Sequence, residues 1–242
     1  VKQARDFYTD KRKSRGLKHT KVNEKDYISN PKPDGYRSMH LIYKYKSDKK
    51  STYDGLLVEL QIRSKIQHAW ATAVETVDLF TKQAIKSNEG NPEWVEFFRL
   101  VSSAFAFMEG EAPVPGTPTN PEELKREIKK LVGSLRVFQK MERWMNAMQA
   151  IEPKIKELHF FLLVLDVTTT EKEKLEIRGY PKDAERMATD HYLEAEKMQG
   201  RDPNKDVVLV AADSVDELKK AYPNYFIDTS LFLNYLRQYL KG

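Results

Sequence analysis

The chain has 242 residues, no cysteine, 40% apolar residues, 32% charged residues and a formal net charge of +5. The absence of cysteine excludes disulfides and thiolate metal sites and fits a reducing, cytoplasmic location. No run of about 18 apolar residues occurs, so we expect no membrane partner. This composition predicts a soluble globular protein with one large domain or two small ones, and its modest positive charge permits an anionic partner without requiring one.

The most basic segment lies at the start of the chain, within residues 1–21. The cations and histidine crowded together in its second half are Lys11, Arg12, Lys13, Arg15, Lys18, His19 and Lys21. Such a run is typical of a solvated helix end or loop, but it would also suit an arm that contacts nucleotide phosphates or an RNA backbone. Both interpretations remain open from the residues alone.

A rigid turn followed by a strand is predicted within residues 25–40, KDYISNPKPDGYRSMH. Pro31 and Pro33 stiffen the turn, and Gly35 permits a backbone angle that other residues resist. In the strand that follows, alternation places Met39, Leu41, Tyr43 and Tyr45 on one face and His40, Ile42, Lys44 and Lys46 on the other.

A second strand runs from Leu56 to Arg63 and leads into a helix. Alternation places Glu59, Gln61 and Arg63 on the face opposite the apolar residues Leu56, Val58, Leu60 and Ile62. Ser64 and Gln67 form a capping box for a helix from Lys65 to about Lys86. If residues 47–55 are the connection of a hairpin, the two strands pair and His40 shares a face with Glu59.

These side chains suit a nucleotide. Glu59 is a lone carboxylate among the cations and histidine of this region, which are Lys32, Arg37, His40 and Arg63. An oxygen ligand for Mg²⁺ beside groups that neutralise phosphate fits a magnesium-bound phosphate. Tyr36, held by the turn, would stack on a base. His68, near the start of the helix, is either a packing residue or part of the site.

The two motifs KDYISNPKPDGYRSMH and VELQIRSKIQHAW resemble the synthetase domain of the RelA/SpoT family, which transfers pyrophosphate from ATP to the 3′-hydroxyl of GTP or GDP. The resemblance implies that Tyr36 stacks on the acceptor guanine and that Lys32 and His40 lie near its phosphates. It implies that Glu59 helps to hold Mg²⁺ and activates the attacking hydroxyl. Three further positions, Gln61, Arg63 and His68, would line the site.

Two departures from the family pattern matter. Asp34 stands where the family often has Asn, which would change the preferred base or acceptor. The family's Arg-x-x-Asp strand, with the partner carboxylate for Mg²⁺, belongs upstream of Lys25, and residues 1–24 contain no such motif. The chain is therefore expected to be a fragment, or a protein that has lost its donor half. A non-catalytic regulatory or binding protein is the corresponding alternative.

A second acceptor is also consistent with the sequence. The run QIRSKIQHAWATAVE and the additional C-terminal module resemble long toxin-type members of the family. That resemblance implies pyrophosphorylation of the 3′ end of tRNA, with the C-terminal module as antitoxin or sensor and hence a protein partner. Free GTP or GDP as the acceptor is the first interpretation.

The rest of the chain predicts helices and then strands. Asn91 opens a helix with an aromatic stripe, residues 110–121 break the chain, and Asn120 starts one long helix with apolar residues at near-heptad spacing. After Pro153 we expect a buried central strand at 159–167, a strand at 175–180, a helix at 182–199, a strand at 207–212, a helix capped by Ser214 and Glu217, and a last helix capped by Asp228.

The predicted fold class is α+β: a nucleotidyltransferase-like mixed sheet with helices, followed by a smaller α+β module. The expected divisions are a synthetase-like domain at 1–110, a linker and long helix at 111–153, and a binding or regulatory module at 154–242.

Overall fold

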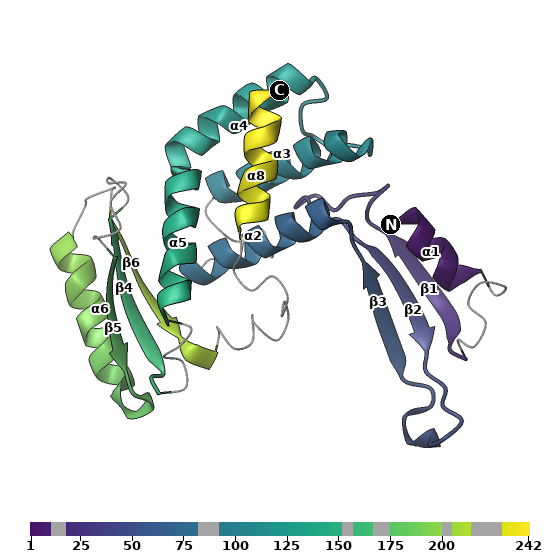
Figure 1. Cartoon of the computed structure of the whole chain (residues 1–242), viewed down its shortest axis with the longest axis horizontal. Helices are drawn as coiled ribbons and strands as arrows, with labels where there is room; N and C mark the ends of the chain where they lie inside the picture. The colour runs from purple at the N-terminus through teal and green to yellow at the C-terminus, as the bar shows by residue number, and fades with distance from the viewer. Residues whose placement is uncertain (11–17, 82–91, 152–156, 167–174, 200–204, 214–228) are drawn as a thin grey trace.

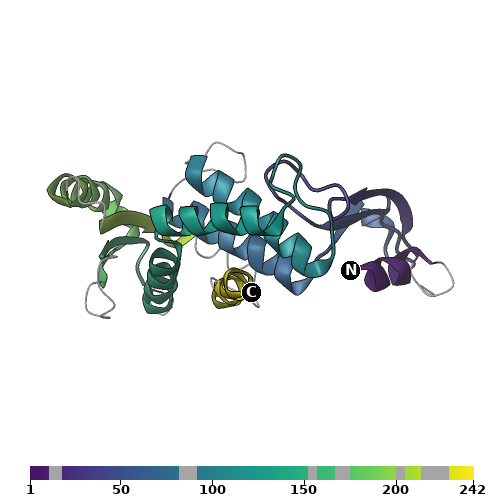
Figure 2. The same ribbon diagram turned by 90° about the horizontal axis from the view of Figure 1, so that it is seen from above.

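The computed structural model describes residues 1–10, 18–81, 92–151, 157–166, 175–199, 205–213 and 229–242 (Figure 1). Two small antiparallel sheets lie on opposite sides of a helical body, as the view from above shows (Figure 2). The α+β class is as predicted. None of the described helices combines the length and the hydropathy needed to cross a membrane.

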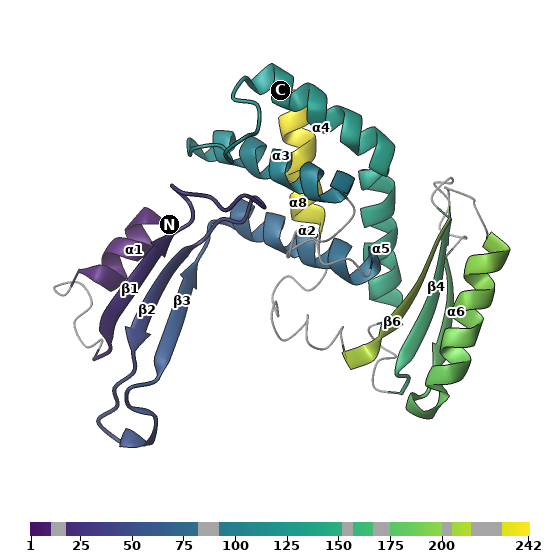
Figure 3. The same cartoon turned by 180° about the vertical axis from the view of Figure 1, so that it is seen from behind.

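The first sheet has the order β1-β2-β3, with β1 at Thr20–Asp26, β2 at Met39–Lys44 and β3 at Leu57–Ile62. Both described pairings are antiparallel, where a mixed sheet was expected, because each strand returns beside its predecessor. A 3-10 turn at Ser51–Tyr53 lies in the β2–β3 connection, which confirms the predicted hairpin. Helix α1 (Lys2–Thr9) lies beside this sheet (Figure 3).

The predicted faces of β2 are confirmed. Met39, Leu41 and Tyr43 are buried in a small apolar cluster that also contains Ile28, and Tyr8 of α1 packs against this cluster. The Tyr43 hydroxyl donates to the Tyr8 carbonyl at 3.0 Å. The opposite face of the sheet is therefore left for polar side chains.

Helix α2 (Lys65–Thr81) continues directly from β3, and the predicted capping box is present. The Ser64 hydroxyl accepts from the Gln67 amide nitrogen at 3.2 Å, and the Gln67 side chain accepts from the Ser64 amide nitrogen at 3.2 Å. The predicted continuation beyond Thr81 lies outside the described residues. Helix α3 (Pro92–Glu109) packs against α2. The predicted apolar stripe of α3 is buried at Trp94, Phe97, Phe98, Val101 and Phe105 and exposed at its last residue, Met108.

Residues 110–120 form no helix, as predicted, and fold back onto α3. The Ser103 hydroxyl accepts from the Val114 amide nitrogen at 2.9 Å and lies 2.7 Å from the Thr117 hydroxyl. Val114 is buried. The connection is therefore packed against the helical body.

The long helix expected after Asn120 is divided into α4 (Pro121–Leu135) and α5 (Val137–Ile151). Arg136 lies between them in the left-handed region, with φ 52° and ψ 47°. Leu135 and Val137 are both buried, so the turn at Arg136 lets each helix direct its apolar face into the same core. Near-heptad spacing predicted the apolar faces but gave no signal for this turn.

The second sheet has the order β5-β4-β6, with β4 (Phe160–Asp166) in the centre as predicted, β5 at Leu175–Tyr180 and β6 at Lys205–Ala211. A 3-10 turn at Lys182–Ala184 leads into α6 (Glu185–Gln199), which packs on one face. The other face contributes Phe161, Leu163, Val208 and Val210 to the main core.

The last helix, α8 (Ser230–Lys241), packs on α2, α3 and α4. Phe232, Leu233 and Leu236 of α8 are buried in the main core. The predicted helix after Ser214 and the predicted cap at Asp228 lie outside the described residues. Residues from all three predicted divisions of the chain therefore contribute to one hydrophobic core, which also supports the turn described next.

Candidate functional site

The turn at residues 31–36 is seated on α3. The Ser102 hydroxyl donates to the Gly35 carbonyl at 2.6 Å, and the Arg99 Nε donates to the Pro33 carbonyl at 3.0 Å. Gly35 has φ +92°, and a Cβ there would lie 2.9 Å from the Cβ of Ser102 and 3.1 Å from the Trp70 ring. Only glycine fits both the backbone angle and the approach to the helices.

Arg37 is a structural residue, which corrects its expected place among the phosphate-neutralising cations. It is 5% exposed and donates to the Ser102 hydroxyl at 3.1 Å, the Ile28 carbonyl at 3.0 Å and the Ala112 carbonyl at 2.6 Å. Burial lowers the pKa of Arg37 to about 10, which still leaves it charged at neutral pH. Its guanidinium joins the turn to α3 and to the loop that follows α3.

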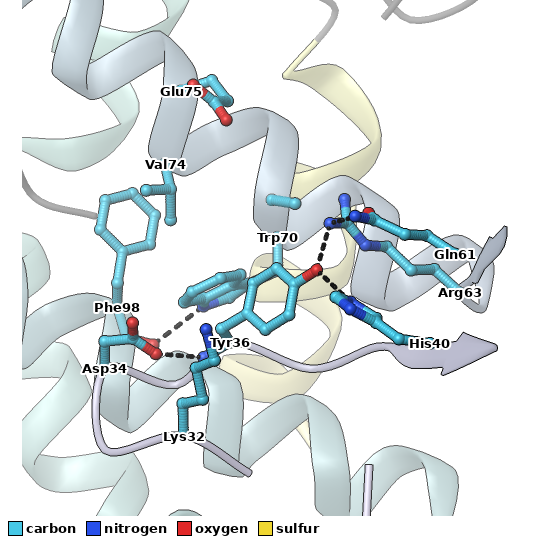
Figure 4. Close-up of a pocket in the computed structure, with 11 residues that line it drawn as sticks. Lys32, Asp34, Tyr36, His40, Gln61, Arg63, Trp70, Val74, Glu75 and Phe98 are labelled. Atoms are coloured by element: carbon cyan, nitrogen blue, oxygen red, sulfur yellow. Dashed lines mark hydrogen bonds between the residues drawn. The ribbon is translucent and has the colours of Figure 1, made fainter. Parts of the chain in front are cut away.

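A pocket of about 390 Å³ opens beside the turn (Figure 4). Its walls come from the turn, the site-facing ends of β2 and β3, α2 and α3, through Lys32, Asp34, Tyr36, His40, Gln61, Arg63, Trp70, Ala71, Val74, Glu75 and Phe98. The expected site residues Lys32, Tyr36, His40, Gln61 and Arg63 are therefore brought together. Asp34 lines the pocket and accepts from the Tyr36 amide nitrogen at 2.8 Å.

Tyr36 is the residue around which the polar wall is arranged. The Lys32 ammonium and the Arg63 guanidinium each lie 5.0 Å from the centre of its ring. Its hydroxyl lies 2.8 Å from the His40 Nε2 and accepts from the Arg63 Nη2 at 2.8 Å. Tyr27 packs edge-on against both Tyr36 and His40. An aromatic ring with cations near it is thus held in place by hydrogen bonds.

Glu59 lies on the same face as His40, as predicted, although it is not among the residues that line the pocket. Its Oε2 is 3.2 Å from the His40 Nδ1, and its Oε1 accepts from the Gln61 Nε2 at 2.6 Å. The Gln61 hydrogen bond, opposed by burial and helped by His40 and Lys25, lowers the pKa of Glu59. The carboxylate is therefore ionised at neutral pH.

His40 is buried, and burial is the main reason that its pKa is lowered. The neighbouring Glu59 acts in the opposite direction, while Arg63 and Lys32 lower the pKa further. A neutral imidazole can accept a hydrogen bond at one nitrogen and donate at the other, as its two contacts require.

His68 lies outside the residues that line this pocket. It is partly buried in α2, and burial followed by the charge of Arg63 lowers its pKa. The charge of Arg63 therefore affects the pKa of His68, although His68 does not line the cavity.

The apolar wall was not predicted as part of the site. Helical spacing predicts Trp70 and Phe98 as core residues, and the structure shows that they are buried and also line the pocket. Val74 lies one turn after Trp70 in α2, and Glu75 lies one turn after Ala71, so these four residues share one side of the helix. That spacing was readable, but nothing in it distinguishes a pocket from a packed interface.

An aromatic pocket bordered by cations, with an ionised carboxylate on the adjoining strand face, defines a site for a phosphorylated aromatic compound such as a nucleotide. Comparison with known proteins finds a family model that matches the segment carrying this site. Residues 3–82 match the model described as a region found in RelA / SpoT proteins. This segment contains the turn, β2, β3 and α2. Residues 3–82 are therefore similar to RelA/SpoT proteins, in agreement with the resemblance of the motifs.

Two curated proteins of Bacillus subtilis strain 168 are similar to the chain. GTP pyrophosphokinase YjbM is 43% identical over 53 residues, and GTP pyrophosphokinase YwaC is 41% identical over 51 residues. These matches cover 22% and 21% of this chain and 25% and 24% of the relatives' own lengths. A solved GTP pyrophosphokinase family protein from Streptococcus pneumoniae has 23% identity and a TM-score of 0.35, over 46% of this chain and 54% of that one.

Proposed function

We propose that this protein transfers pyrophosphate from ATP to the 3′-hydroxyl of GTP or GDP, and that the pocket at Tyr36 binds the guanine of the acceptor. The observation that carries the proposal is the fixed Tyr36 ring, which lines a cavity large enough for a base and has two cations, Lys32 and Arg63, each 5.0 Å from its centre. Stacking on an aromatic ring binds a base. The match of residues 3–82 to the RelA/SpoT model supports the reaction type.

The charged wall suits the acceptor's phosphates. Lys32 lies on the exposed side of the turn, and its ammonium is 5.0 Å from the centre of the Tyr36 ring. It can therefore form an ion pair with the phosphates of a nucleotide whose base stacks on Tyr36. Arg63 has one nitrogen engaged with Tyr36 and Gln61 and keeps further N–H donors for an anion. In this proposal His40, which contacts Tyr36 and Glu59, acts on the acceptor mainly through those two residues.

Magnesium fits the donor set only in part. Glu59 offers an ionised, half-exposed carboxylate, and the described residues contain no cluster of three potential ligands around it. Mg²⁺ is commonly held by one or two carboxylates with substrate phosphates and water, so Glu59 would supply one ligand. When bound, the ion would neutralise charge on the transferred pyrophosphate. Glu59 itself would orient the attacking 3′-hydroxyl and accept a hydrogen bond from it.

The experiment that tests this proposal supplies the protein with ATP labelled in its β and γ phosphates, with GDP or GTP as acceptor. Label should appear in the guanine nucleotide, and Tyr36→Ala should reduce this transfer while the unfolding midpoint stays near that of the unchanged protein. Glu59→Gln should reduce it through loss of charge. Normal turnover by both variants would remove the assignment of this pocket.

The 3′ end of tRNA is a second candidate acceptor, favoured by a basic surface at the end of the first sheet. Lys18 forms an ion pair with Asp48, and His19 stacks on Tyr45 at 4.9 Å, so the described end of the basic segment lies against the β2–β3 hairpin. The hairpin adds the exposed lysines Lys44, Lys46, Lys49 and Lys50. Cations from two distant segments thus gather where a phosphate backbone could lie. Bulk tRNA in the same labelling assay distinguishes the acceptors.

The C-terminal module, in either case, is proposed as a regulatory or sensor element. Its last helix contacts the wall of the pocket: the ring of Phe232 in α8 lies 6.0 Å from the ring of Phe98, and Phe98 lines the cavity. A partner that moves α8 would therefore change the support of the Tyr36 pocket.

A further inference from the structure

Five side chains on the polar face of the first sheet form a closed ring of hydrogen bonds. The distances are 3.2 Å from Glu59 to His40, 2.8 Å from His40 to Tyr36, 2.8 Å from Tyr36 to Arg63, 3.1 Å from Arg63 to Gln61 and 2.6 Å from Gln61 back to Glu59. Much of this ring is visible from the pocket side (Figure 4).

Closure fixes the direction of each hydrogen bond. A guanidinium only donates, and the Arg63 Nη2 carries two hydrogens, one for the Tyr36 hydroxyl oxygen and one for the Gln61 Oε1. At the other end the ionised Glu59 carboxylate only accepts, so a neutral His40 carries its proton on Nδ1 and donates it to Glu59. The His40 Nε2 is then unprotonated and accepts from the Tyr36 hydroxyl. Gln61 accepts at its oxygen and donates to Glu59 at its nitrogen.

The result is two parallel paths from one cation to one anion. One path runs from Arg63 through Tyr36 and His40 to Glu59, and the other runs from Arg63 through Gln61 to Glu59. Chains of hydrogen bonds with all donors aligned strengthen one another, more so where water is excluded. His40 is buried and its ring is packed edge-on by Tyr27, so the longer path is also restrained sterically.

We propose that His40 and Gln61 are positioning residues that join the Tyr36 ring and the Glu59 carboxylate into one unit. The proposal rests on the proposed function, in which a purine nucleotide stacks on Tyr36 and its ribose hydroxyl meets Glu59. Stacking uses the face of the Tyr36 ring and leaves its hydroxyl in the ring of hydrogen bonds. The base-binding group and the hydroxyl-orienting group are thus held at a fixed separation before any ligand binds, which favours reaction over mere binding.

The first test needs no ligand. In the chain labelled with ¹⁵N, long-range proton–nitrogen correlation at one fixed neutral pH reports which imidazole nitrogen of His40 carries the proton. The closed ring of hydrogen bonds requires that the His40 proton lies on Nδ1. A His40 signal from the Nε2–H tautomer, or from an equal mixture of the two, would overturn the proposal, whatever the enzyme assay shows.

The second test is a double-mutant cycle with Tyr36→Phe, which keeps the stacking ring, and Gln61→Met, which keeps the side-chain length. No hydrogen bond joins these two residues, so independent contacts would make their effects on kcat/KM for GDP multiply. Suppose that each single change lowers kcat/KM by about tenfold. If the five side chains act as one hydrogen-bonded unit, the kcat/KM of the double variant should lie within about twofold of that of the less active single variant. A loss of about 100-fold in the double variant would contradict the ring.

Gln238→Met is the matched control, because it makes the same chemical change at an exposed position on α8, away from the pocket. It should retain wild-type kcat/KM and unfold at the same urea concentration as Gln61→Met. Wild-type kcat/KM in Gln61→Met would refute the positioning role. A wild-type chain that transfers no label would defeat the proposed function, while the His40 tautomer would still decide whether the ring exists.

Discussion

Replacement of Gly35 by alanine should destabilise the protein through two separable effects. The first is backbone strain, because φ +92° is unfavourable for a residue with a Cβ and costs about 1–2 kcal/mol. The second is steric, because the new Cβ would lie 2.9 Å from the Ser102 Cβ and 3.3 Å from the Phe98 carbonyl oxygen, within a packed region. Overpacking of this kind costs about 1–3 kcal/mol, so the total should be about 2–5 kcal/mol.

Gly55→Ala provides the matched control. Gly55 has nearly the same angle, φ +91°, but its added Cβ would meet only the flexible end of Lys44 at 3.5 Å. It should therefore lose only the backbone part, about 1–2 kcal/mol. The difference between the two variants isolates the contact between the turn and the helices.

Urea unfolding followed by circular dichroism measures both losses, with the slope m checked for constancy. Binding of GDP by calorimetry supplies a second readout, because a turn that shifts away from α3 to relieve the clash would also displace Tyr36. Equal destabilisation of the two variants, with unchanged GDP affinity in Gly35→Ala, would refute the reasoning that α3 seats the turn.

Three further predictions follow from particular contacts. Arg37→Met should destabilise the protein by about 2–4 kcal/mol in urea unfolding, since it leaves the buried Ile28 carbonyl and the part-buried Ala112 carbonyl without their Arg37 donor. Phe232→Ala should cost about 3–5 kcal/mol and weaken GDP binding, whereas Phe80→Ala, which empties a comparable core position away from the pocket, should cost as much and spare GDP binding. Asp26→Asn should destabilise the protein at neutral pH but progressively less as the pH falls through the range of the carboxyl, as urea unfolding at several pH values would show.

The sign of the pH effect follows from the contacts of Asp26. Burial would raise the pKa of its carboxyl, but hydrogen bonds from Ser29 and from the Ile28 amide nitrogen outweigh burial and lower it. A group with a lowered pKa in the folded state contributes stability above its unfolded pKa, and that contribution is lost as the pH falls through the folded pKa. A pH-independent difference in unfolding free energy between Asp26→Asn and the unchanged chain would contradict this.

The other two predictions also have contrary results. A loss of unfolding free energy below about 1 kcal/mol in Arg37→Met would contradict the first. Equal GDP affinities of the two phenylalanine variants would contradict the second.

Local chemistry allowed much of the site to be predicted. Strict alternation in β2 and β3 predicts that His40 and Glu59 lie on one face. The pairing of the two strands places the His40 Nδ1 3.2 Å from the Glu59 Oε2. Ser64 and Gln67 satisfy each other's backbone groups within a single turn, so the start of α2 was readable from four residues. Such features depend on neighbours in sequence or on one hairpin, and patterns of residue type report them well.

Arg37 shows where that reasoning ends. In the sequence it stands beside Tyr36 and looks like another phosphate ligand, but its three acceptors come from the residues before the turn, from α3 and from the loop beyond α3. The turn at Arg136 is similar, because only the shared core of α4 and α5 requires the helix to end there.

The sequence by itself determined the faces of β2 and β3, the glycine turn and most of the polar residues that surround Tyr36, because each follows from short-range periodicity or from backbone chemistry. Only the tertiary structure decided that Trp70 and Phe98 form the apolar wall, that Arg37 is buried, and that Glu59, His40, Tyr36, Arg63 and Gln61 close into a ring. These depend on atoms from distant segments meeting within a few ångströms, and no local pattern of residues encodes such distances.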